Sequence, residues 1–509
     1  MHAESLKCFK MKNLFITIVI ISINLLGFAQ FQTPGTGLNW NLDDLVANSG
    51  GVVTLETNGQ YSITQDLTIS DSDTLTIVTP EEINVSDGVL ITIAGTFISH
   101  PESGIVFFKA LDNYYLGFRF EDSQGSDLTN TYFKKAGGIQ LVNSDMAFRY
   151  CDFTEFNQEN STGTINLFQS SPLIENCSFS DNDGPAVMSG ANSTSSPQIL
   201  GCEIKFNVAA NGNTPQINLG TSGTDSIRII NCEIIGNPEN IMAGGIAITT
   251  LAGGSLKARV EGNIIRDNRY GITCYGSNIA SVIRGNEIVD NNTQNQPMLG
   301  GSGINFFGTA TNQSLVSGNI ITGNLWGITI QGTAQPNFGQ LEGEIYNPGA
   351  NTFKDNGNEG EIYDLYNNTP NTIMAQNNYW GTTNPDTVEM HIFHQPDDPS
   401  LGLIEYLPLY NPPVGLVDFS GEENHTVFSV YPNPAKGYFY LMINEDLNPV
   451  DEPLRAEILT LSGETLQTFS LPGTTSLHKL TTPERFSGMA LLKVSFGKTY
   501  ETIKIRVAH

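Results

Sequence analysis

A phrase repeated along the middle of the chain constrains the fold more than any other feature. Between Gly262 and Gly332 it is written three times, as GNIIRDN then GITCYG, GNEIVDN then GINFFG, and GNIITGN then GITIQG. A repeat of short apolar strands separated by Asn and Gly is typical of a solenoid, in which each unit stacks on the last and buries a core that no unit buries alone. The phrase therefore predicts a stack of coils.

The repeat extends well beyond these three copies when the phrase is aligned on its final Asn. The copies are NCSFSDN (176–182), GCEIKFN (201–207), NCEIIGN (231–237), GNIIRDN (262–268), GNEIVDN (285–291), GNIITGN (318–324) and ANTFKDN (350–356), with YCDFTEFN (150–157) carrying one extra residue. The period of about 23 to 33 residues is that of coils whose turns carry insertions.

Alternation along a strand divides the phrase into inner and outer positions. We expect the second residue (Cys or Asn) and the fourth (Ile or Phe) to face the core, and the third and fifth to face solvent. The last Asn should lie in a turn, because Asn tolerates left-handed backbone and bonds its neighbours. Identical turns should then stack an Asn ladder along the solenoid axis.

Four cysteines fill the second position of successive coils, namely Cys151, Cys177, Cys202 and Cys232. Stacked strands lie about 4.8 Å apart, and parallel Cβ vectors stay about that far apart, beyond the roughly 3.5 to 4.5 Å of a disulfide. We expect a buried column of free thiols. A metal site is not expected there, since ligands in a straight column cannot surround an ion.

Charge restricts the partners. The chain has 509 residues and a net charge of -28, from 52 acidic and 24 basic residues. This balance argues against binding to nucleic acid or to anionic lipid, both of which need a basic surface. No segment shows sustained helical periodicity, so the composition favours an all-β chain.

The N-terminus has the pattern of a targeting segment. Lys7, Lys10 and Lys12 precede the apolar run from Leu14 to Phe28, which is short for a membrane span. We interpret residues 1–30 as a secretory signal peptide, with an uncleaved anchor as the alternative, and expect no transmembrane segment in the mature chain.

Residues 40–120 alternate Leu, Thr, Ile and Val between Asp, Gly and Pro turns, as in TLTIVTPEEINVSDGVLITIAGTFIS. This passage resembles the N-terminal coils of secreted right-handed parallel β-helices of the pectate-lyase-like kind. The resemblance implies a right-handed parallel β-helix over 31–413, with regular repeats at 130–376.

A second resemblance marks the end of the array. NNYWGTTNPDTVEMHIFHQPDDPSLGLIEYLPLYNPP resembles the segment that closes many β-helix surface proteins, and makes 377–413 a cap. Without such a cap the last coil would offer an open edge to other chains. The apolar residues expected to cover the core are Tyr379, Trp380, Ile392, Phe393, Leu403, Ile404 and Tyr406.

Beyond an acidic linker at 414–426, residues 427–509 carry short alternating strands that indicate a small β-sandwich. The motifs YPNP (431–434), LTLSG (459–463) and Ser487-Gly488 resemble the type A C-terminal sorting domain of the Bacteroidetes type IX secretion system, although Ala490 stands where the family usually has Tyr. The resemblance implies export by the type IX machinery and its sortase, and a protein that is released or attached to the outer face of the outer membrane.

Parallel β-helices include lyases, hydrolases and noncatalytic adhesins, so catalysis must be argued from residues. No histidine lies between His100 and His391, and no paired-Asp run with a Gly-His-Gly partner is present. The best catalytic candidates are the outward residues Glu203, Lys205, Glu233 and Arg266. They could serve a lyase for anionic sugars, with Lys205 or Arg266 as base, or they could be a solvated face whose charges offset one another.

Candidate ligand-binding residues are Arg269, Tyr270, Glu287 and Trp326. Tyr270 and Trp326 each lie just before a repeat Gly with one coil between them, so their rings should be about 10 Å apart, a spacing suited to stacking on a glycan. The alternative is that each ring covers a turn.

We expect no cofactor, with calcium possible at two aspartate pairs. These are Asp397 with Asp398, and Asp181 with Asp183, all of which could equally be solvated turn residues. The preferred hypothesis is a secreted or surface-attached β-helix that binds extracellular polysaccharide or cell-surface glycan without catalysis. The alternative is a polysaccharide lyase or glycosidase acting on acidic polysaccharide.

Overall fold

In a computed structural model of the chain, residues 30–157, 162–410, 428–443, 454–460, 463–471, 477–483, 486–496 and 499–508 are described. The expected signal peptide, apart from residue 30, and the expected linker at 414–426 lie outside them. Two compact units divide between Asn411 and Pro412. No helix in the described ranges is long and apolar enough to cross a membrane.

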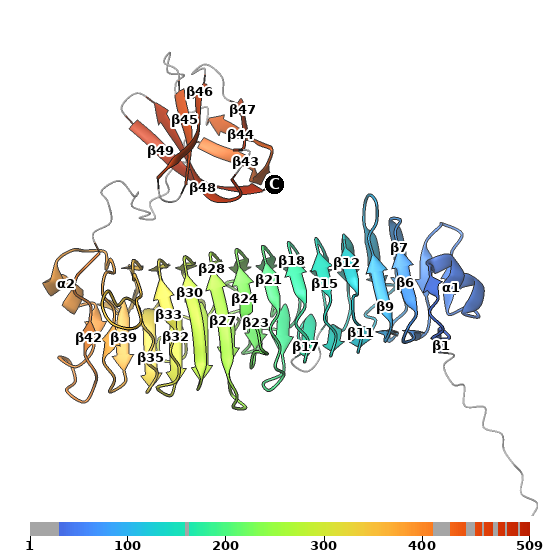
Figure 1. Ribbon diagram of the computed structural model, residues 1–509, viewed down its shortest axis with the longest axis horizontal. Coiled ribbons are helices and arrows are strands. Elements are labelled where there is room, and N and C mark those ends of the chain that lie inside the picture. The colour runs from blue at the N-terminus through green and yellow to red at the C-terminus, as the bar shows by residue number, and fades with distance from the viewer. Residues whose placement is uncertain are drawn as a thin grey trace, which may run out of the picture. The chain divides into compact units, whose positions relative to one another are not determined.

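The first unit is a stack of coils built from three long sheets, and nearly every strand is parallel to its neighbours (Figure 1). Sheet A has fourteen strands: β1 (Phe31–Gln32), β5 (Leu67–Ile69), β8 (Leu90–Ile93), β11 (Gly117–Glu121), β14 (Ile139–Val142), β17 (Ile165–Phe168), β20 (Val187–Ser189), β23 (Pro215–Leu219), β26 (Gly244–Thr249), β29 (Ile272–Gly276), β32 (Ser302–Gly308), β35 (Trp326–Gly332), β39 (Leu365–Asn368) and β41 (Ile392–Phe393).

Sheet B has eleven strands: β2 (Asn39–Trp40), β6 (Thr74–Ile77), β9 (Thr96–Ser99), β12 (Asp127–Thr129), β15 (Ala147–Arg149), β18 (Leu173–Glu175), β21 (Gln198–Leu200), β24 (Ile227–Ile230), β27 (Leu256–Glu261), β30 (Ile279–Arg284) and β33 (Leu315–Ser317). Sheet C has thirteen and holds the repeated phrase: β3 (Val53–Leu55), β4 (Tyr61–Ile63), β7 (Glu81–Val85), β10 (Val106–Ala110), β13 (Thr131–Lys134), β16 (Asp152–Thr154), β19 (Ser178–Ser180), β22 (Glu203–Lys205), β25 (Glu233–Ile235), β28 (Ile264–Arg266), β31 (Glu287–Val289), β34 (Ile320–Thr322) and β36 (Thr352–Lys354).

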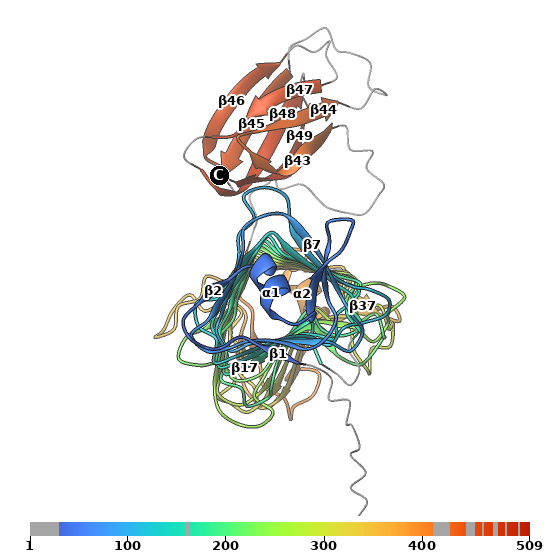
Figure 2. The same ribbon diagram turned by 90° about the vertical axis from the view of Figure 1, so that its right-hand side faces the viewer.

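Equivalent positions of the phrase lie directly above one another, as the repeat predicts. In sheet C, Phe153 pairs with Phe179, which pairs with Ile204, and all three side chains are buried. The Phe153 and Phe179 rings stack with centroids 4.6 Å apart. Viewed along the stack, successive coils superimpose around this core (Figure 2).

The second-position column is also confirmed. Cys151, Cys177, Cys202 and Cys232 are all buried and unpaired, and burial raises the pKa of the last three thiols well above its ordinary value. The column then continues in asparagine: the Cys232 N–H donates to Asn263 Oδ1 at 2.9 Å. From there each Nδ2 donates to the next Oδ1 at 2.8–2.9 Å through Asn263, Asn286, Asn319, Asn351 and Asn378.

The final Asn of the phrase forms a second ladder, with two departures from expectation. The left-handed backbone belongs to the preceding residue, such as Asp267 (φ 58°) or Asp290 (φ 54°), while the Asn itself turns inward and is buried. Asn237 does not join: Gly236 before it lacks the left-handed backbone of its equivalents, and Asn237 Oδ1 accepts the Glu239 N–H at 3.0 Å instead. Gln216 of β23 replaces it and donates to Asn268 Oδ1 at 2.9 Å.

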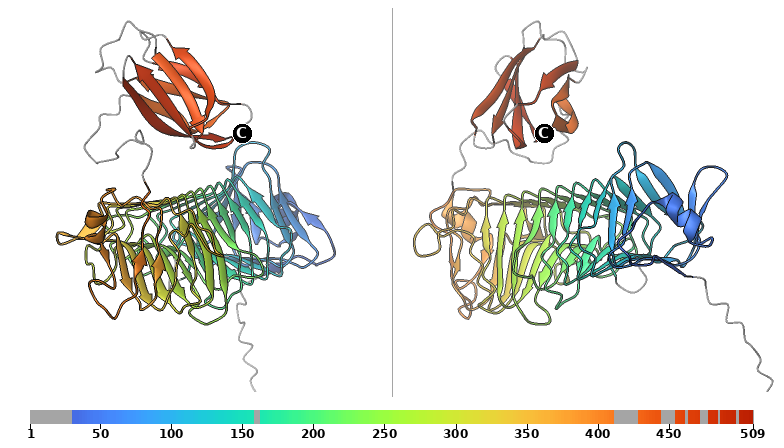
Figure 3. Two further views of the ribbon diagram at one scale, coloured as in Figure 1. Left: turned by 60° about the vertical axis from the view of Figure 1, so that its left-hand side comes forward. Right: turned by 45° about the vertical axis from the view of Figure 1, so that its right-hand side comes forward.

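Both ends of the core are covered. At the N-terminal end α1 (Leu42–Asn48) buries Leu42 and Leu45. At the other end lie α2 (Pro385–Glu389), the strands β40 (Ile373–Met374) and β42 (Ile404–Glu405), and the wholly buried Trp380, while the hairpin of β37 (Gly357–Asn358) and β38 (Glu361–Ile362) projects from the loop between β36 and β39. Two of the residues expected to cover the core do not: Leu403 is 38% exposed, and Phe393 faces outward, where it stacks on Tyr366. Figure 3 shows the regular stacking between these two ends.

The second unit contains seven strands in one connected sheet that closes around its own core. The strands are β43 (Phe428–Lys436), β44 (Tyr438–Ile443), β45 (Leu454–Thr460), β46 (Thr465–Leu471), β47 (Leu477–Thr481), β48 (Gly488–Phe496) and β49 (Thr499–Ala508), in the order β46-β45-β48-β49-β43-β44-β47. Phe439 and Leu441 of β44 share one buried cluster with Ile458 of β45 and Leu492 of β48. Ala490 is wholly buried, so a small residue fits the core there.

Candidate functional site

Three of the four catalytic candidates form a compact charged cluster on the outer face of sheet C. Glu203 and Glu233 are register partners in β22 and β25, and Lys205 Nζ lies 3.0 Å from one carboxylate and 2.8 Å from the other. Burial lowers the pKa of an amine, but the hydrogen bonds and charges of Glu233 and Glu203 outweigh it, so the pKa of Lys205 is raised. Lys205 is therefore an ammonium at neutral pH, which suits a structural ion pair better than a general base.

The remaining charges of this face do not join the cluster. Arg266 pairs in register with Ile235, which is buried rather than exposed as the alternation predicts, and its guanidinium contacts Asp267. Glu287 pairs in register with Ile264. An apolar step therefore separates both residues from the cluster of Lys205, and the four catalytic candidates do not converge on one point.

Asp152 is a functional candidate that the sequence reasoning missed. Burial, followed by the charge of Glu203, raises the pKa of this carboxyl, and its Oδ1 is buried without a hydrogen-bond partner. Ser178 lies between Asp152 and Glu203 in the register. The signal was available, because Asp152 occupies the same third position of the phrase as Glu203 and Glu233.

Arg269, expected to bind ligand, instead ties loops together. Its side chain is buried, and its guanidinium donates to Gln294 Oε1 at 2.6 Å, to the Leu299 carbonyl oxygen at 2.5 Å and to Asn213. Tyr270 packs its ring on Gly244, where a Cβ would lie 2.3 Å from the ring. Both side chains therefore pack against turns of the β-helix, as expected under the alternative in which they cover a turn rather than bind a ligand.

Trp326 belongs to a group of aromatic side chains that the sequence reasoning did not assemble. Its ring stacks on Tyr363 with centroids 4.8 Å apart and meets Tyr366 edge-on at 5.2 Å, while Nε1 donates to the Pro297 carbonyl oxygen at 2.8 Å. Tyr366 in turn stacks on Phe393 at 4.8 Å. All four rings are partly exposed.

A second aromatic stack lies on the same sheet. Tyr275 of β29 and Phe307 of β32 are outward register partners whose parallel rings are 4.8 Å apart, and Tyr275 is 38% exposed. We call these two stacks together the aromatic face, formed by Tyr275, Phe307, Trp326, Tyr363, Tyr366 and Phe393. The aromatic face could not be predicted from the sequence, because its rings occupy different positions along their strands and only the register between coils brings them together.

Uncharged polar side chains lie between the two stacks. Asn305 Nδ2 donates to Thr273 Oγ1 at 3.1 Å, and Thr329 Oγ1 donates to Asn305 Oδ1 at 2.8 Å. Gln331 is the register partner of Phe307, and Thr329 is that of Tyr366. Hydroxyl and carboxamide groups beside flat apolar rings can bind a ligand that has both an apolar face and hydroxyl groups.

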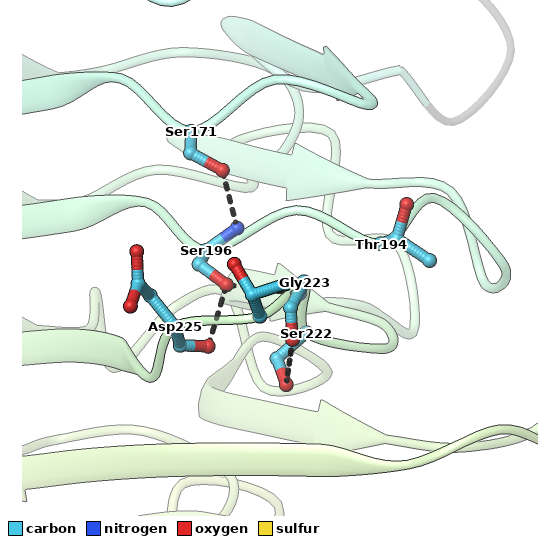
Figure 4. A pocket seen from close by; sticks show the side chains of 7 residues that line it. Ser171, Thr194, Ser196, Ser222, Gly223 and Asp225 are labelled. Atoms are coloured by element: carbon cyan, nitrogen blue, oxygen red, sulfur yellow. Dashed lines mark hydrogen bonds between the residues drawn. The ribbon is translucent and has the colours of Figure 1, made fainter.

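An open pocket with a volume of about 480 Å³ lies at the turns that connect sheet A to sheet B (Figure 4). Its lining residues are Ser171, Thr194, Ser196, Ser222, Gly223, Thr224 and Asp225. The Ser196 N–H donates to Ser171 Oγ at 2.9 Å, and Ser196 Oγ donates to the Asp225 carbonyl oxygen at 2.7 Å. These hydroxyls hold successive turns together. The serine-rich runs at 169–172 and 193–196 were the signal for this ladder of turns.

The aspartates considered for calcium serve as turn caps. Asp397 Oδ2 accepts the His394 N–H at 2.9 Å, and Asp398 Oδ1 accepts the N–H and hydroxyl of Ser400. Asp181 has a left-handed backbone (φ 55°) in its turn, and burial raises the pKa of Asp183. Within the described ranges no group of three or more His, Cys, Asp or Glu side chains is placed to hold a metal ion. Calcium binding at these aspartates stays a prediction.

Comparison with known families identifies both units. Residues 109–251 match the right-handed β-helix region, and residues 429–508 match the secretion system C-terminal sorting domain. The chain is therefore a right-handed β-helix protein with a type IX sorting domain, which directs it to secretion or to the cell surface. No curated protein matches the sequence.

Solved structures with some likeness are phage tailspikes. One is a mutant tailspike of E. coli bacteriophage HK620 in complex with a pentasaccharide, at 12% identity and a TM-score of 0.24, covering 89% of this chain and 87% of that chain. Another is tailspike gp49 of Acinetobacter baumannii bacteriophage Fri1, a capsular polysaccharide depolymerase, at 9% identity and a TM-score of 0.17, covering 94% and 78%.

Proposed function

We propose that this secreted or cell-surface β-helix protein binds extracellular glycan on its aromatic face and acts as a noncatalytic scaffold. Large aromatic side chains normally find shelter, so a run of them left partly exposed on a rigid sheet is informative. The observation that carries the proposal is the pair of stacks on sheet A, Tyr275 on Phe307 and Trp326 against Tyr366, the second completed by Tyr363 from the turn before β39.

The scaffold also fits the task. A sugar ring presents C–H groups on its faces and hydroxyl groups around its edge, so it packs on aromatic rings while neighbouring polar side chains accept and donate hydrogen bonds. The rings are anchored: Trp326 Nε1 is held by the Pro297 carbonyl oxygen, and β29, β32 and β35 are parallel neighbours. A preorganised site of this kind loses little conformational entropy on binding.

The alternative, a lyase or glycosidase on sheet C, has less support. A lyase needs a base near neutral pH, whereas Lys205 is held as an ammonium by Glu203 and Glu233. Arg266 contacts Asp267 and pairs with Ile235. Asp152 has a raised carboxyl pKa suited to an acid, but its neighbour Glu203 is already paired with Lys205.

The test is affinity electrophoresis of the full secreted chain in gels that contain a panel of neutral and acidic polysaccharides. Retardation by at least one polymer is expected. Trp326→Ala and Tyr366→Ala should weaken binding at least about tenfold, which is about 1.4 kcal/mol. Tyr114→Ala is the matched control, because Tyr114 is 37% exposed on the loop before β11, far along the stack from the aromatic face. Absence of retardation by every polymer would refute the proposal.

A further inference from the structure

The strands of sheet A are almost free of charge. Among their described residues, Arg119 and Glu121 of β11 are the only charged or titratable His, Asp, Glu, Lys or Arg side chains, and these two form an ion pair with each other at 3.0 Å. The ten strands from β14 to β41 contain none. Sheets B and C differ sharply, since their outer rows carry ion pairs such as Arg259 with Glu261 and Lys205 with Glu233.

The uncharged surface continues beyond the strands of the aromatic face. The stretches 244–256, 271–283, 301–321 and 325–340 include β26, β29, β32 and β35 with the turns that follow them, and none contains a charged residue. These stretches stack in register through the four strands. In a chain with 15% charged residues and a net charge of -28, such a surface is a distinct chemical environment.

The border of this surface on the sheet C side is acidic. Glu239, Glu359 and Glu361 are exposed on the loops that lead into sheet A. Arg269, the basic residue beside these loops, is buried and already donates to Gln294, Asn213 and Leu299. A carboxylate or sulfate on a ligand would meet negative potential at this border and would lose hydration at the aromatic face without gaining a cationic partner.

From this we infer that the ligand is a neutral polysaccharide of pyranose rings, bound along the solenoid axis across the aromatic face. The inference rests on the proposed function and narrows it to a substrate class. Phe307 and Tyr366 are separated by two strand spacings, about 10 Å along the axis, which a chain of linked sugars spans and a single ring does not. Asn305, on the strand of Phe307, and Gln331, on the next strand, are partly exposed and offer neutral hydrogen bonds to hydroxyl groups.

The experiment compares neutral mixed-linkage β-glucan, glucomannan and galactomannan with the C6-oxidised form of each polymer, which differs only by carboxylates. Dissociation constants for the full secreted chain would be measured at low and high NaCl. We expect a neutral polymer to bind at least tenfold more tightly than its oxidised form, with an affinity that salt leaves unchanged, because no charges are paired. Gln331→Lys adds a cation beside Phe307 and should raise affinity for the oxidised form.

Other outcomes separate the inference from the proposed function. Preference for the oxidised polymers, lost at high salt, would overturn the neutral class. Loss of that preference in Lys205→Ala would locate glycan binding on sheet C. Failure to bind any polymer would overturn the proposed function itself. Tyr275→Ala is the second probe of the face, since Tyr275 is its most accessible ring and its removal disturbs the core least. Unchanged thermal unfolding in this variant, with at least fivefold weaker binding of the neutral polymer, supports the inference.

Discussion

Replacing Asn291 with Ala should destabilise the β-helix by several kcal/mol although the side chain is small. Asn291 Oδ1 accepts from the N–H and from Nδ2 of Asn268 at 3.3 and 3.1 Å, and Asn291 Nδ2 donates to the Ile265 carbonyl oxygen and to Asn324 Oδ1 at 3.0 and 3.2 Å. Four hydrogen bonds at about 0.5–1.5 kcal/mol each amount to roughly 2–6 kcal/mol. The buried Asn268 N–H also loses its acceptor, so we expect about 4 kcal/mol.

Denaturant unfolding followed by tryptophan fluorescence measures this loss. The three tryptophans, Trp40, Trp326 and Trp380, all lie in the β-helix, so the signal excludes the sorting domain. Asn368→Ala is the matched control, because Asn368 is exposed at the end of β39 and its loss should cost less than about 0.5 kcal/mol. If Asn291→Ala and the control unfold at the same denaturant concentration, the amide ladder is not a determinant of stability.

Three further predictions concern the charged and thiol groups. The hydrogen bond to Asp364 raises the pKa of His391, so the stability that this contact contributes is fully present below the ordinary histidine pKa of about 6.5 and is lost as pH rises through the raised value. The unfolding temperature of the wild type should therefore fall between pH 6 and pH 8 by more than that of His391→Gln. Equal falls would exclude the His391–Asp364 contact as the cause. The cysteines from Cys151 to Cys274 are buried, so maleimide should label none in the native chain and all five after unfolding, whereas rapid native labelling would contradict the inward column. Lys205→Ala should change the free energy of unfolding by less than about 1 kcal/mol, because the carboxylates that it pairs with are largely exposed to solvent. Binding of neutral glycan should stay intact, because Lys205 lies on sheet C and the aromatic face on sheet A; a large effect on binding would place the site on sheet C.

Most of the β-helix followed from one periodic phrase, because strand alternation and coil stacking leave little freedom once the register is set. Cys177, Cys202 and Ile204 face inward as expected, and Glu203 stacks on Glu233. The exceptions have local causes. Asn237 stays out of the ladder where Gly236 before it lacks the left-handed backbone of its equivalents, and Gln216, from another sheet, takes the vacant place.

The binding surface was harder to predict because it depends on neighbours that are distant in sequence. Trp326 was a candidate from the sequence, yet the rings packed around it, Tyr363, Tyr366 and Phe393, lie in stretches outside the repeated phrase. The burial of Arg269 could not be predicted, because no pattern shows that inserted loops from two other coils will bury its guanidinium. Alternation gives the face of a residue, whereas loop lengths decide what covers it.

The most direct test of this account is a crystal structure of the chain with an oligosaccharide from a neutral polymer that it binds. The account predicts sugar rings stacked on Trp326 or Tyr366 and on Tyr275 or Phe307, with the glycan running across β29, β32 and β35 and hydrogen-bonded to Asn305 or Gln331. Sugar bound instead beside Lys205 and Glu233 on sheet C, with the aromatic face empty, would contradict it.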